Sequence, residues 1–346
     1  MKFCLFDASN LVHRAKHVVG KPKGPTYSNQ EEQTYSSNER LGMVLHVVFN
    51  SLKKAYEKFG ANHAVVCFDR KSWRREITET YKANRREVVR TPTEQADHEA
   101  IIKTIDTLRD FFRDYTNVTV LEAHYAEADD FIARWVQLHE DEAFGHVIVS
   151  ADTDFKQLVR PGVDLFSPIA STLYTIDGVF YQDGKKPKKD EVLVEKYGES
   201  WKIKTDKQGE ALRFDPKWEL FEKCIRGDTS DNIPAAWPGV RTKAMEKAFY
   251  GDAMEWNNFI NSTWGGEENP MSVRELYEMN KLLIDLTMQP DAVKELIDEA
   301  IAEALEKPHK PLVGAYFTKF CAQHGLMNLL GRSDSIARIL NTSYNQ

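Results

Sequence analysis

The sequence predicts an α/β protein whose centre is a mostly parallel, twisted sheet flanked by helices. Up to about residue 168, short continuous apolar runs alternate with segments of helical periodicity. Continuous apolar runs are typical of strands covered on both faces, and their alternation with helices indicates a doubly wound sheet. From residue 215 onward the patterns are helical, which predicts a second, helical region packed on the sheet domain.

The predicted elements follow this alternation along the chain. We expect helices at 41–59, 99–112 and 127–139, where apolar residues recur at helical spacing. The expected strands cover residues 2–7, 63–69, 118–123, 146–152 and 163–168. We interpret residues 169–214 as an insertion that begins with a hairpin carrying a basic tip. The predicted domains are therefore 1–214 and 215–346, and residues 291–307 form the clearest amphipathic helix of the second.

Composition restricts the class of protein. The 346 residues are 42% hydrophobic and 29% charged, as in ordinary globular proteins. No apolar run approaches the roughly 20 residues of a membrane helix, and Asp7 interrupts the apolar start where a secretory signal would continue. The four cysteines form no CxxC pair, so we expect reduced thiols in a cytoplasmic protein.

Acidic side chains follow three of the predicted strands. Asp7, Asp69 and Asp152 come at or just after the ends of their apolar runs, and the carboxyl ends of parallel strands meet at one edge of a sheet. The stretch EADD at 127–130 opens a helix that runs back from this edge. The predicted cluster consists of Asp7, Asp69, Glu127, Asp129, Asp130, Asp152, Asp154, Asp228 and Asp231.

So many carboxylates in one cleft require cations, because crowding raises their pKa values. Mg²⁺ is suited to such a site, since it binds carboxylate and phosphate oxygens while it keeps several waters. Each acid also has a simpler interpretation. Asp129 or Asp130 alone could serve only to favour a helix N-terminus, and Asp7 alone could be a turn residue.

A basic segment follows the strand that ends near Asp69. Between Arg70 and Arg90 the chain has eight basic and three acidic residues, despite its net charge of −7. Arginine and lysine bind phosphates, and aromatic side chains stack on bases. The candidate nucleic-acid contacts here are Arg74, Arg75, Tyr81, Lys82, Arg85 and Arg86. The alternative is a solvated basic helix face.

A second candidate contact lies at 233–249, where Pro238-Gly239 predicts a turn that opens a helix. Backbone N–H groups at a helix start can hold a phosphate. The candidate residues are Gly239, Arg241, Thr242 and Lys243.

These motifs, in this order, resemble those of the flap endonuclease and 5′-to-3′ exonuclease family. They read LFDASN, CFDR…WRR…YKANR, EADD, SADTDF and GDTSDNIP…PGV. Among its members the chain is most similar to the bacteriophage enzymes called ribonuclease H, which remove RNA primers and 5′ flaps. The resemblance implies a PIN-like 5′ nuclease core and, in the helical region, a helix-hairpin-helix-like element near 233–249 that grips duplex phosphates.

The resemblance also implies roles for individual residues. It implies two Mg²⁺ ions, for which Mn²⁺ would substitute: one held by Asp7, Asp69, Glu127, Asp129 and Asp130 with a share of Asp152, the other by Asp152, Asp154, Asp228 and Asp231. Lys82 and Arg85 would contact the scissile phosphate at the base of a helical arch near 82–97. With Asp130 and Asp152, these two form the predicted catalytic set.

Two departures from the family pattern stand out. Arg241 occupies the position where the hairpin usually has its second glycine, and we expect it to strain a turn that requires positive φ. The segment 169–215 is longer than in most members, and the sequence assigns it no role.

The resemblance implies a monomeric, phage-encoded enzyme of DNA replication or repair that works in the host cytoplasm. Its substrates would be DNA and RNA–DNA hybrids with a 5′ flap or free 5′ end. A single-strand-binding protein or another replisome component would be a partner, although no motif marks a surface for it. Two alternatives stay open: a Mg²⁺-dependent phosphatase with an aspartyl nucleophile, and a non-catalytic nucleic-acid-binding homologue.

Overall fold

The structure is a computed structural model that describes residues 1–19, 37–85, 88–141, 143–188, 191–206, 208–266 and 268–344. In this part of the chain a central sheet of nine strands forms. The strands are β1 (Lys2–Asp7), β2 (His63–Cys67), β3 (Thr119–Leu121), β4 (Gly145–Val149), β5 (Val163–Ser167), β6 (Thr172–Thr175), β7 (Gly178–Tyr181), β8 (Leu193–Lys196) and β9 (Glu199–Ile203). Their order is β3-β2-β1-β4-β5-β6-β7-β9-β8.

Strands β1 to β5 are parallel, which confirms the mostly parallel sheet. The helices are α1 (Ala8–Val19), α2 (Ser37–Phe59), α3 (Arg74–Ile77), α4 (Pro92–Tyr115), α5 (Ala128–Leu138), α6 (Pro216–Arg226), α7 (Thr242–Tyr250), α8 (Ala253–Ile260), α9 (Val273–Ile284), α10 (Asp291–Glu306), α11 (Val313–Gln323), α12 (Met327–Leu330) and α13 (Ser333–Leu340). Two short 3-10 helices, η1 (Ala83–Arg85) and η2 (Thr153–Leu158), and the small hairpin β10 (Thr263–Trp264) with β11 (Met271–Ser272) complete the described elements.

Alternating side chains of the central strands fill two separate cores. Phe3 and Leu5 of β1 face the core that α5 and α10 complete, whereas Cys4 and Phe6 face the core formed with α1, α2 and α4. Successive side chains of a strand point to opposite faces, so a strand covered on both faces is apolar throughout. This explains why the short apolar runs of the sequence locate these strands.

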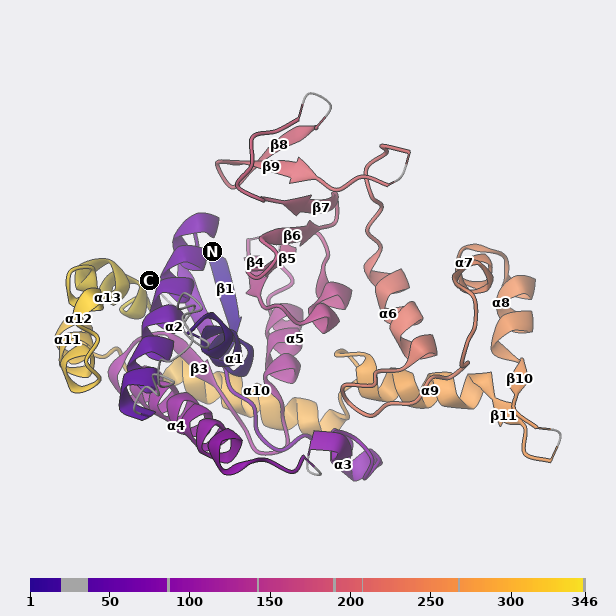
Figure 1. Ribbon diagram of the computed structural model, residues 1–346, viewed down its shortest axis with the longest axis horizontal. Coiled ribbons are helices and arrows are strands. Elements are labelled where there is room, and N and C mark those ends of the chain that lie inside the picture. The colour runs from indigo at the N-terminus through magenta and orange to yellow at the C-terminus, as the bar shows by residue number, and fades with distance from the viewer. Residues whose placement is uncertain are drawn as a thin grey trace, which may run out of the picture.

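The helical region after residue 215 packs in two ways. Helices α6 to α9 surround a core of their own, and Figure 1 shows them projecting from one end of the molecule. The chain then returns to the sheet domain. Helix α10 packs beside α5. Helices α11 and α13 contact α4 and α2 respectively, and Figure 1 shows these two helices at the end of the molecule opposite α6 to α9.

The segment 169–214 extends the sheet with antiparallel strands β6 to β9. The prediction of a hairpin with a basic tip is wrong in one respect. The β6–β7 turn is formed by Ile176 and Asp177, and Lys185, Lys186 and Lys188 follow β7 as an exposed connection. The mostly apolar run from Leu173 to Tyr181 continues across this turn, so the sequence does not show that the chain reverses at Ile176 and Asp177.

All four cysteines are buried and none forms a disulfide. Within the described residues, no helix has both the length and the hydropathy that a membrane-spanning segment needs.

Two buried histidines make the stability of the fold dependent on pH. His63 and His146 are 0% and 3% exposed, and burial lowers the pKa of each to about 4. Between that value and the unfolded value of 6.5, only the unfolded chain binds the proton, so the contribution of each histidine to stability falls as pH falls. Each histidine should cost about 2 kcal/mol at pH 5. Urea unfolding at pH 7 and pH 5 checks this, and His146→Leu should remove part of the loss. A loss that is unchanged in the variant would contradict the assignment.

Candidate active site

Three strands of the parallel sheet bring acidic residues to one edge. Asp7 ends β1 in register with Cys67 at the end of β2, and Asp69 lies two residues beyond Cys67. Asp152 follows β4, the neighbour of β1 on the other side. The side chain of Asn10 accepts a hydrogen bond from Ala151 N at 3.2 Å and so ties the first turn of α1 to the loop that carries Asp152.

Helix α5 begins at the same edge. The carboxylate of Asp69 accepts a hydrogen bond from Ala128 N at 2.9 Å, which places the strand-end acid at the start of the helix. Glu127 is the N-cap residue, and its backbone N–H donates to Asp130 Oδ2 at 3.0 Å. Acids in the first turn favour a helix because they complement its partial positive charge.

Lys82 lies among these acids and is one of their counter-charges. It forms an ion pair with Glu127 and lies 3.6 Å from Asp231 Oδ2. Arg85, which is more exposed, binds Asp231 Oδ1 at 2.6 Å. The hydroxyl of Tyr81 donates to Glu127 at 3.0 Å and contacts Asp231 at 3.2 Å. The loop that carries Asp231 is therefore held next to the start of α5.

A second cation that the sequence analysis missed is Lys223 of α6. Its ammonium group forms ion pairs with Asp154 and, at 2.7 Å, with Asp228. The sequence grouped Asp231 with these two acids, but the described ion pairs link Asp231 to Lys82 and Arg85. Lys223 stands in the last turn of a helix, where lysine is common, so its sequence position gives no sign of this role.

The electrostatics of the edge differ from acid to acid. Burial, together with Asp69 and Asp152, holds the pKa of Asp7 well above its usual range. Burial and the neighbouring acids do the same for the pKa of Asp129, despite Arg74. In contrast, Lys82 and Arg74 outweigh burial and lower the pKa of Glu127 to about 2. Carboxylates with raised pKa values are the ones that a bound cation would relieve.

The donor set suits a hard divalent cation, because it offers carboxylate oxygens and no sulfur or imidazole. Among the described residues, Glu127, Asp129 and Asp130 bring ligand atoms within 4.8 Å of one another. The structure does not bring Asp152, Asp154, Asp228 and Asp231 to such spacing in the described part of the chain. The division of the nine acids between two ions therefore stays a prediction.

Two of the predicted nucleic-acid contacts need correction. Arg74 and Tyr81 are 1% and 2% exposed, and both bind carboxylates of the site. A side chain so deeply buried cannot reach a nucleic acid, and the sequence does not distinguish an arginine that binds internal carboxylates from one that binds phosphate. Arg75 is half-buried and Arg85 is exposed. Arg86 lies outside the described residues, as does part of the predicted arch.

The start of α7 is open to solvent. Gly239, Arg241, Thr242 and Lys243 are all exposed. Gly239 has φ of +73°, whereas Arg241 has φ of −77°. The predicted strain at Arg241 is therefore wrong, because only the first position of this turn needs positive φ. The role of these residues in phosphate binding stays a prediction.

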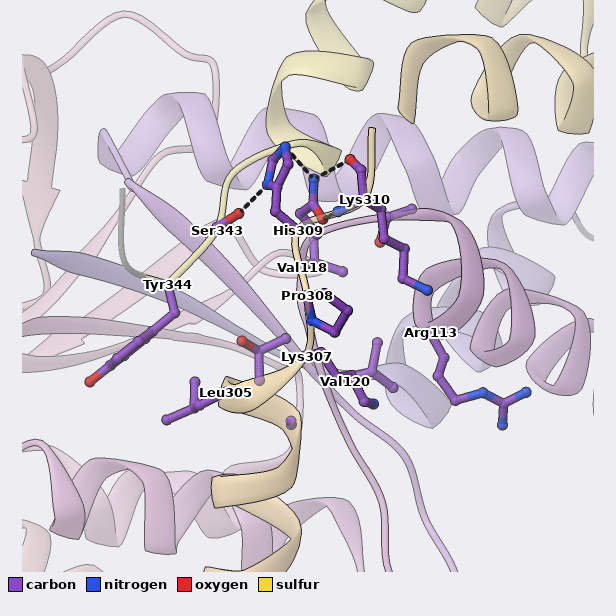
Figure 2. A pocket seen from close by; sticks show the side chains of 14 residues that line it. Arg113, Val118, Val120, Leu305, Lys307, Pro308, His309, Lys310, Ser343 and Tyr344 are labelled. Atoms are coloured by element: carbon purple, nitrogen blue, oxygen red, sulfur yellow. Dashed lines mark hydrogen bonds between the residues drawn. The ribbon is translucent and has the colours of Figure 1, made fainter. Parts of the chain in front are cut away.

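A small pocket lies beside β3, the outermost strand on one side of the sheet. It has a volume of about 260 Å³ and is lined by the end of α4, the start of β3 and the residues after α10. Figure 2 shows Arg113, Lys307 and Lys310 around it, with Val118, Val120 and Pro308 nearby. None of the predicted site residues lines this pocket, so it plays no part in the acidic site.

Comparison with known proteins agrees with the geometry of the edge. Residues 2–197, more than half of the chain, match the 5′–3′ exonuclease N-terminal, resolvase-like domain. The chain belongs to this exonuclease family. The matched region contains β1 to β8 and α1 to α5, and with them seven of the predicted metal ligands and the catalytic candidates Lys82 and Arg85.

Relatives of this exonuclease-family chain include viral and bacterial proteins. Ribonuclease H of Enterobacteria phage T4 is 32% identical over 136 residues, which cover 37% of this chain and 44% of the relative. DNA polymerase I of Mycobacterium bovis is 29% identical over 301 residues, or 84% of this chain and 28% of the polymerase. The chain thus spans less than half the length of these curated relatives.

Solved structures share the fold of this exonuclease-family chain. The phage T5 5′-exonuclease with bound zinc superposes with a TM-score of 0.59 at 19% identity, covering 88% of this chain and 99% of that one. The phage T5 D15 flap endonuclease in a complex with DNA and metal ions gives a TM-score of 0.57 at 20% identity, with 88% and 98% covered. At this identity the comparison establishes the fold.

Proposed function

We propose that this protein is a structure-specific, metal-dependent 5′ nuclease that hydrolyses phosphodiester bonds near a free 5′ end or a 5′ flap. One observation carries the proposal. Acids from separate segments meet at one edge of the sheet, and Lys82 and Arg85 lie among them as cations for a phosphate. Family membership supports it.

The names of the relatives suggest the substrate. A ribonuclease H and a flap endonuclease complexed with DNA stand among the similar proteins. We propose that the 5′ strand is RNA of a primer or DNA of a flap, annealed to a DNA template, and that the enzyme serves phage replication or repair in the host cytoplasm as a monomer. A single-strand-binding protein would then be a neighbour on the same template.

The proposed cofactor is Mg²⁺, with Mn²⁺ as a substitute. The sequence prediction assigns one ion to Asp7, Asp69, Glu127, Asp129 and Asp130 with a share of Asp152, and the other to Asp152, Asp154, Asp228 and Asp231. A bound pair of such ions supplies a hydroxide-like water and stabilises the leaving oxygen in phosphodiester hydrolysis.

The remaining work falls to side chains of the protein. Lys82 and Arg85 would leave their carboxylate partners and bind the phosphate, where they offset the charge that develops during hydrolysis. Lys223 would leave Asp154 and Asp228 in the same way. Each cation is paired with an acid of the site in this structure, which supports a position beside the proposed metal ions. The products would carry a 5′-phosphate and a 3′-hydroxyl.

We expect the start of α7 to bind phosphates of the duplex. Replacing Arg241 and Lys243 together with serine should weaken duplex binding at every sequence, because phosphate contacts carry no base specificity. The slope of log affinity against log salt should fall by about 1 to 2, at about 0.9 for each lost contact. Fluorescence anisotropy at several salt concentrations measures this.

Lys247 provides the matched control on the same helix, because it is 72% exposed and already paired with Glu255 at 3.1 Å. Lys247→Ser should keep the wild-type slope. If the double variant also keeps it, the start of α7 does not contact the duplex.

A labelled 5′-flap duplex tests the proposed function. We expect cleavage with Mg²⁺ or Mn²⁺ and none with EDTA. p-Nitrophenyl phosphate is the parallel substrate, and hydrolysis of this ester without flap cleavage would favour the aspartyl phosphatase. Flap binding without cleavage under any divalent metal would favour the non-catalytic homologue.

A further inference from the structure

The guanidinium group of Arg74 is buried at the centre of the acidic edge. Its Nη2 donates to Asp130 Oδ1 at 2.9 Å, and its Nη1 donates to Asp130 Oδ2 at 3.1 Å and to Glu127 at 3.2 Å. Its Nε donates to the carbonyl of Leu283, at the end of α9, at 2.8 Å. All its nitrogens are therefore engaged, and they join three separate parts of the chain.

The carboxylate of Asp130 is equally engaged. It is 0% exposed and receives four hydrogen bonds: two from Arg74, one from Trp73 Nε1 at 3.3 Å and one from Glu127 N at 3.0 Å. An ionised carboxylate offers about four acceptor positions. In this structure no position is left on Asp130 for a metal ion, which distinguishes it from Asp129 with its 23% exposed side chain.

We infer that Arg74 and Asp130 are a positioning pair that orients the metal-binding acids, and that Asp130 is not itself a metal ligand. The inference deepens the proposed function and rests on it. Arg74 fixes the carboxylate of Glu127 directly, and Asp130 fixes the backbone of Glu127 at the N-cap of α5. Residues that orient ligands in this way commonly change metal affinity about 10- to 100-fold when altered.

The pair also connects the acidic edge to the helical region. Gln289, in the segment that follows α9, donates a hydrogen bond to the backbone carbonyl of Asp130 at 3.2 Å. Gln157 of η2 also holds the end of α9, because it donates to Ile284 O at 3.0 Å and accepts from Leu286 N at 2.9 Å. The start of α5 and the end of α9 therefore form one hydrogen-bonded unit. A disturbance of Arg74 would reach both the acids and the attachment of α9.

Arg74→Lys tests the pair, because lysine keeps the charge but cannot bond Asp130, Glu127 and Leu283 together. Mn²⁺ binding is measured by calorimetry without nucleic acid, with thermal unfolding as a check of folding. We expect a loss of affinity of about 10- to 100-fold. Flap cleavage at saturating Mn²⁺ should recover most of its rate, since the altered residue is not a ligand.

The matched control is Arg134→Lys on α5, the helix that also carries Asp130. Arg134 also binds an aspartate through two nitrogens, with both distances to Asp298 at 2.6 Å, but away from the acidic edge. It should bind Mn²⁺ as the wild type does. A folded Arg74→Lys with wild-type affinity would overturn the inference.

A double-mutant cycle separates a positioning pair from a ligand. Arg74→Met and Asp130→Asn are compared with the variant that combines them, which leaves no buried charge unpaired. If the two residues act as a pair, the combined variant binds Mn²⁺ no worse than the weaker single variant. If Asp130 were a ligand, its replacement would lower affinity by the same factor in either background, and the inference would fail.

The outcomes that would contradict the proposed nuclease differ from those that would contradict the positioning pair. A wild-type protein that binds Mn²⁺ but does not cleave the flap would contradict the nuclease, while the binding cycle would still decide the role of the pair. A wild-type protein that binds no Mn²⁺ would contradict both.

Discussion

Replacing Asp129 with asparagine is expected to reduce flap cleavage by at least about 1,000-fold, the equivalent of about 4 kcal/mol in the barrier. Asp129 is the most exposed member of the trio at the start of α5, with 23% of its side chain accessible against 9% for Glu127 and 0% for Asp130. Burial and its acidic neighbours raise its pKa, and a bound cation would relieve this unfavourable charge. Single-turnover cleavage at saturating Mg²⁺ measures the effect.

The variant should still bind the flap duplex, because Asp129 carries charge of the wrong sign for a phosphate contact. Asp177→Asn, on the exposed turn between β6 and β7, is the control with the same chemical change and should cleave normally. Cleavage by Asp129→Asn at the wild-type rate would remove Asp129 from the metal site.

Replacing Lys82 with methionine should reduce the cleavage rate by about 100- to 1,000-fold, the size expected when one preorganised cation is lost from a transition state. The amine is nearly buried between Glu127 and Asp231. The backbone of Lys82 has φ of +54°, an uncommon conformation for a residue with a Cβ. Its N–H donates to Asp231 O at 2.8 Å, which keeps the residue in place.

The rate constant at saturating substrate is the informative measurement, since the loss should fall on it rather than on duplex affinity. Lys71→Met is the matched control from the same basic segment, because Lys71 is 44% exposed and pairs with Glu76 at the surface. A Lys82→Met enzyme that turns over like the Lys71→Met enzyme would exclude a role for this amine in the reaction.

The positions of the parallel strands, and of the acids at their ends, could be predicted because each depends only on residues that are close together in the sequence. A strand buried on both faces must be apolar along its length, and an acid at its end is visible in the sequence. Asp7 and Asp69 were placed at one edge by this rule alone, and the register of β1 with β2 puts them there.

The direction in which a long cationic side chain points depends on contacts that are distant in the sequence, and the sequence therefore did not predict it. Arg74 and Arg75 are neighbours with the same chemistry, yet Arg74 points into the acidic edge and is 1% exposed. Which of them turns inward depends on Asp130 and on Leu283, more than two hundred residues away in the chain. Lys223 was missed for the same reason.

The backbone geometry of the insertion and of the turn before α7 could not be predicted from the sequence either. Strands β6 to β9 form because β5 has an open edge for β6 to pair with, and an open edge is a property of the assembled sheet. Arg241 was judged by a family pattern, whereas its own backbone is extended.

Thr342 and Tyr344 lie against the first two strands of the sheet, and this has a consequence for synthesis. Tyr344 stacks on Phe3 with ring centroids 6.0 Å apart, and the carbonyl of Thr342 bonds His63 of β2 at 3.0 Å. Ribosomes usually let an N-terminal domain fold while the remainder is still being made, at about 5 to 20 residues per second. Here the nascent sheet keeps apolar surface uncovered until α10 to α13 have emerged, because residues of these helices complete its two cores.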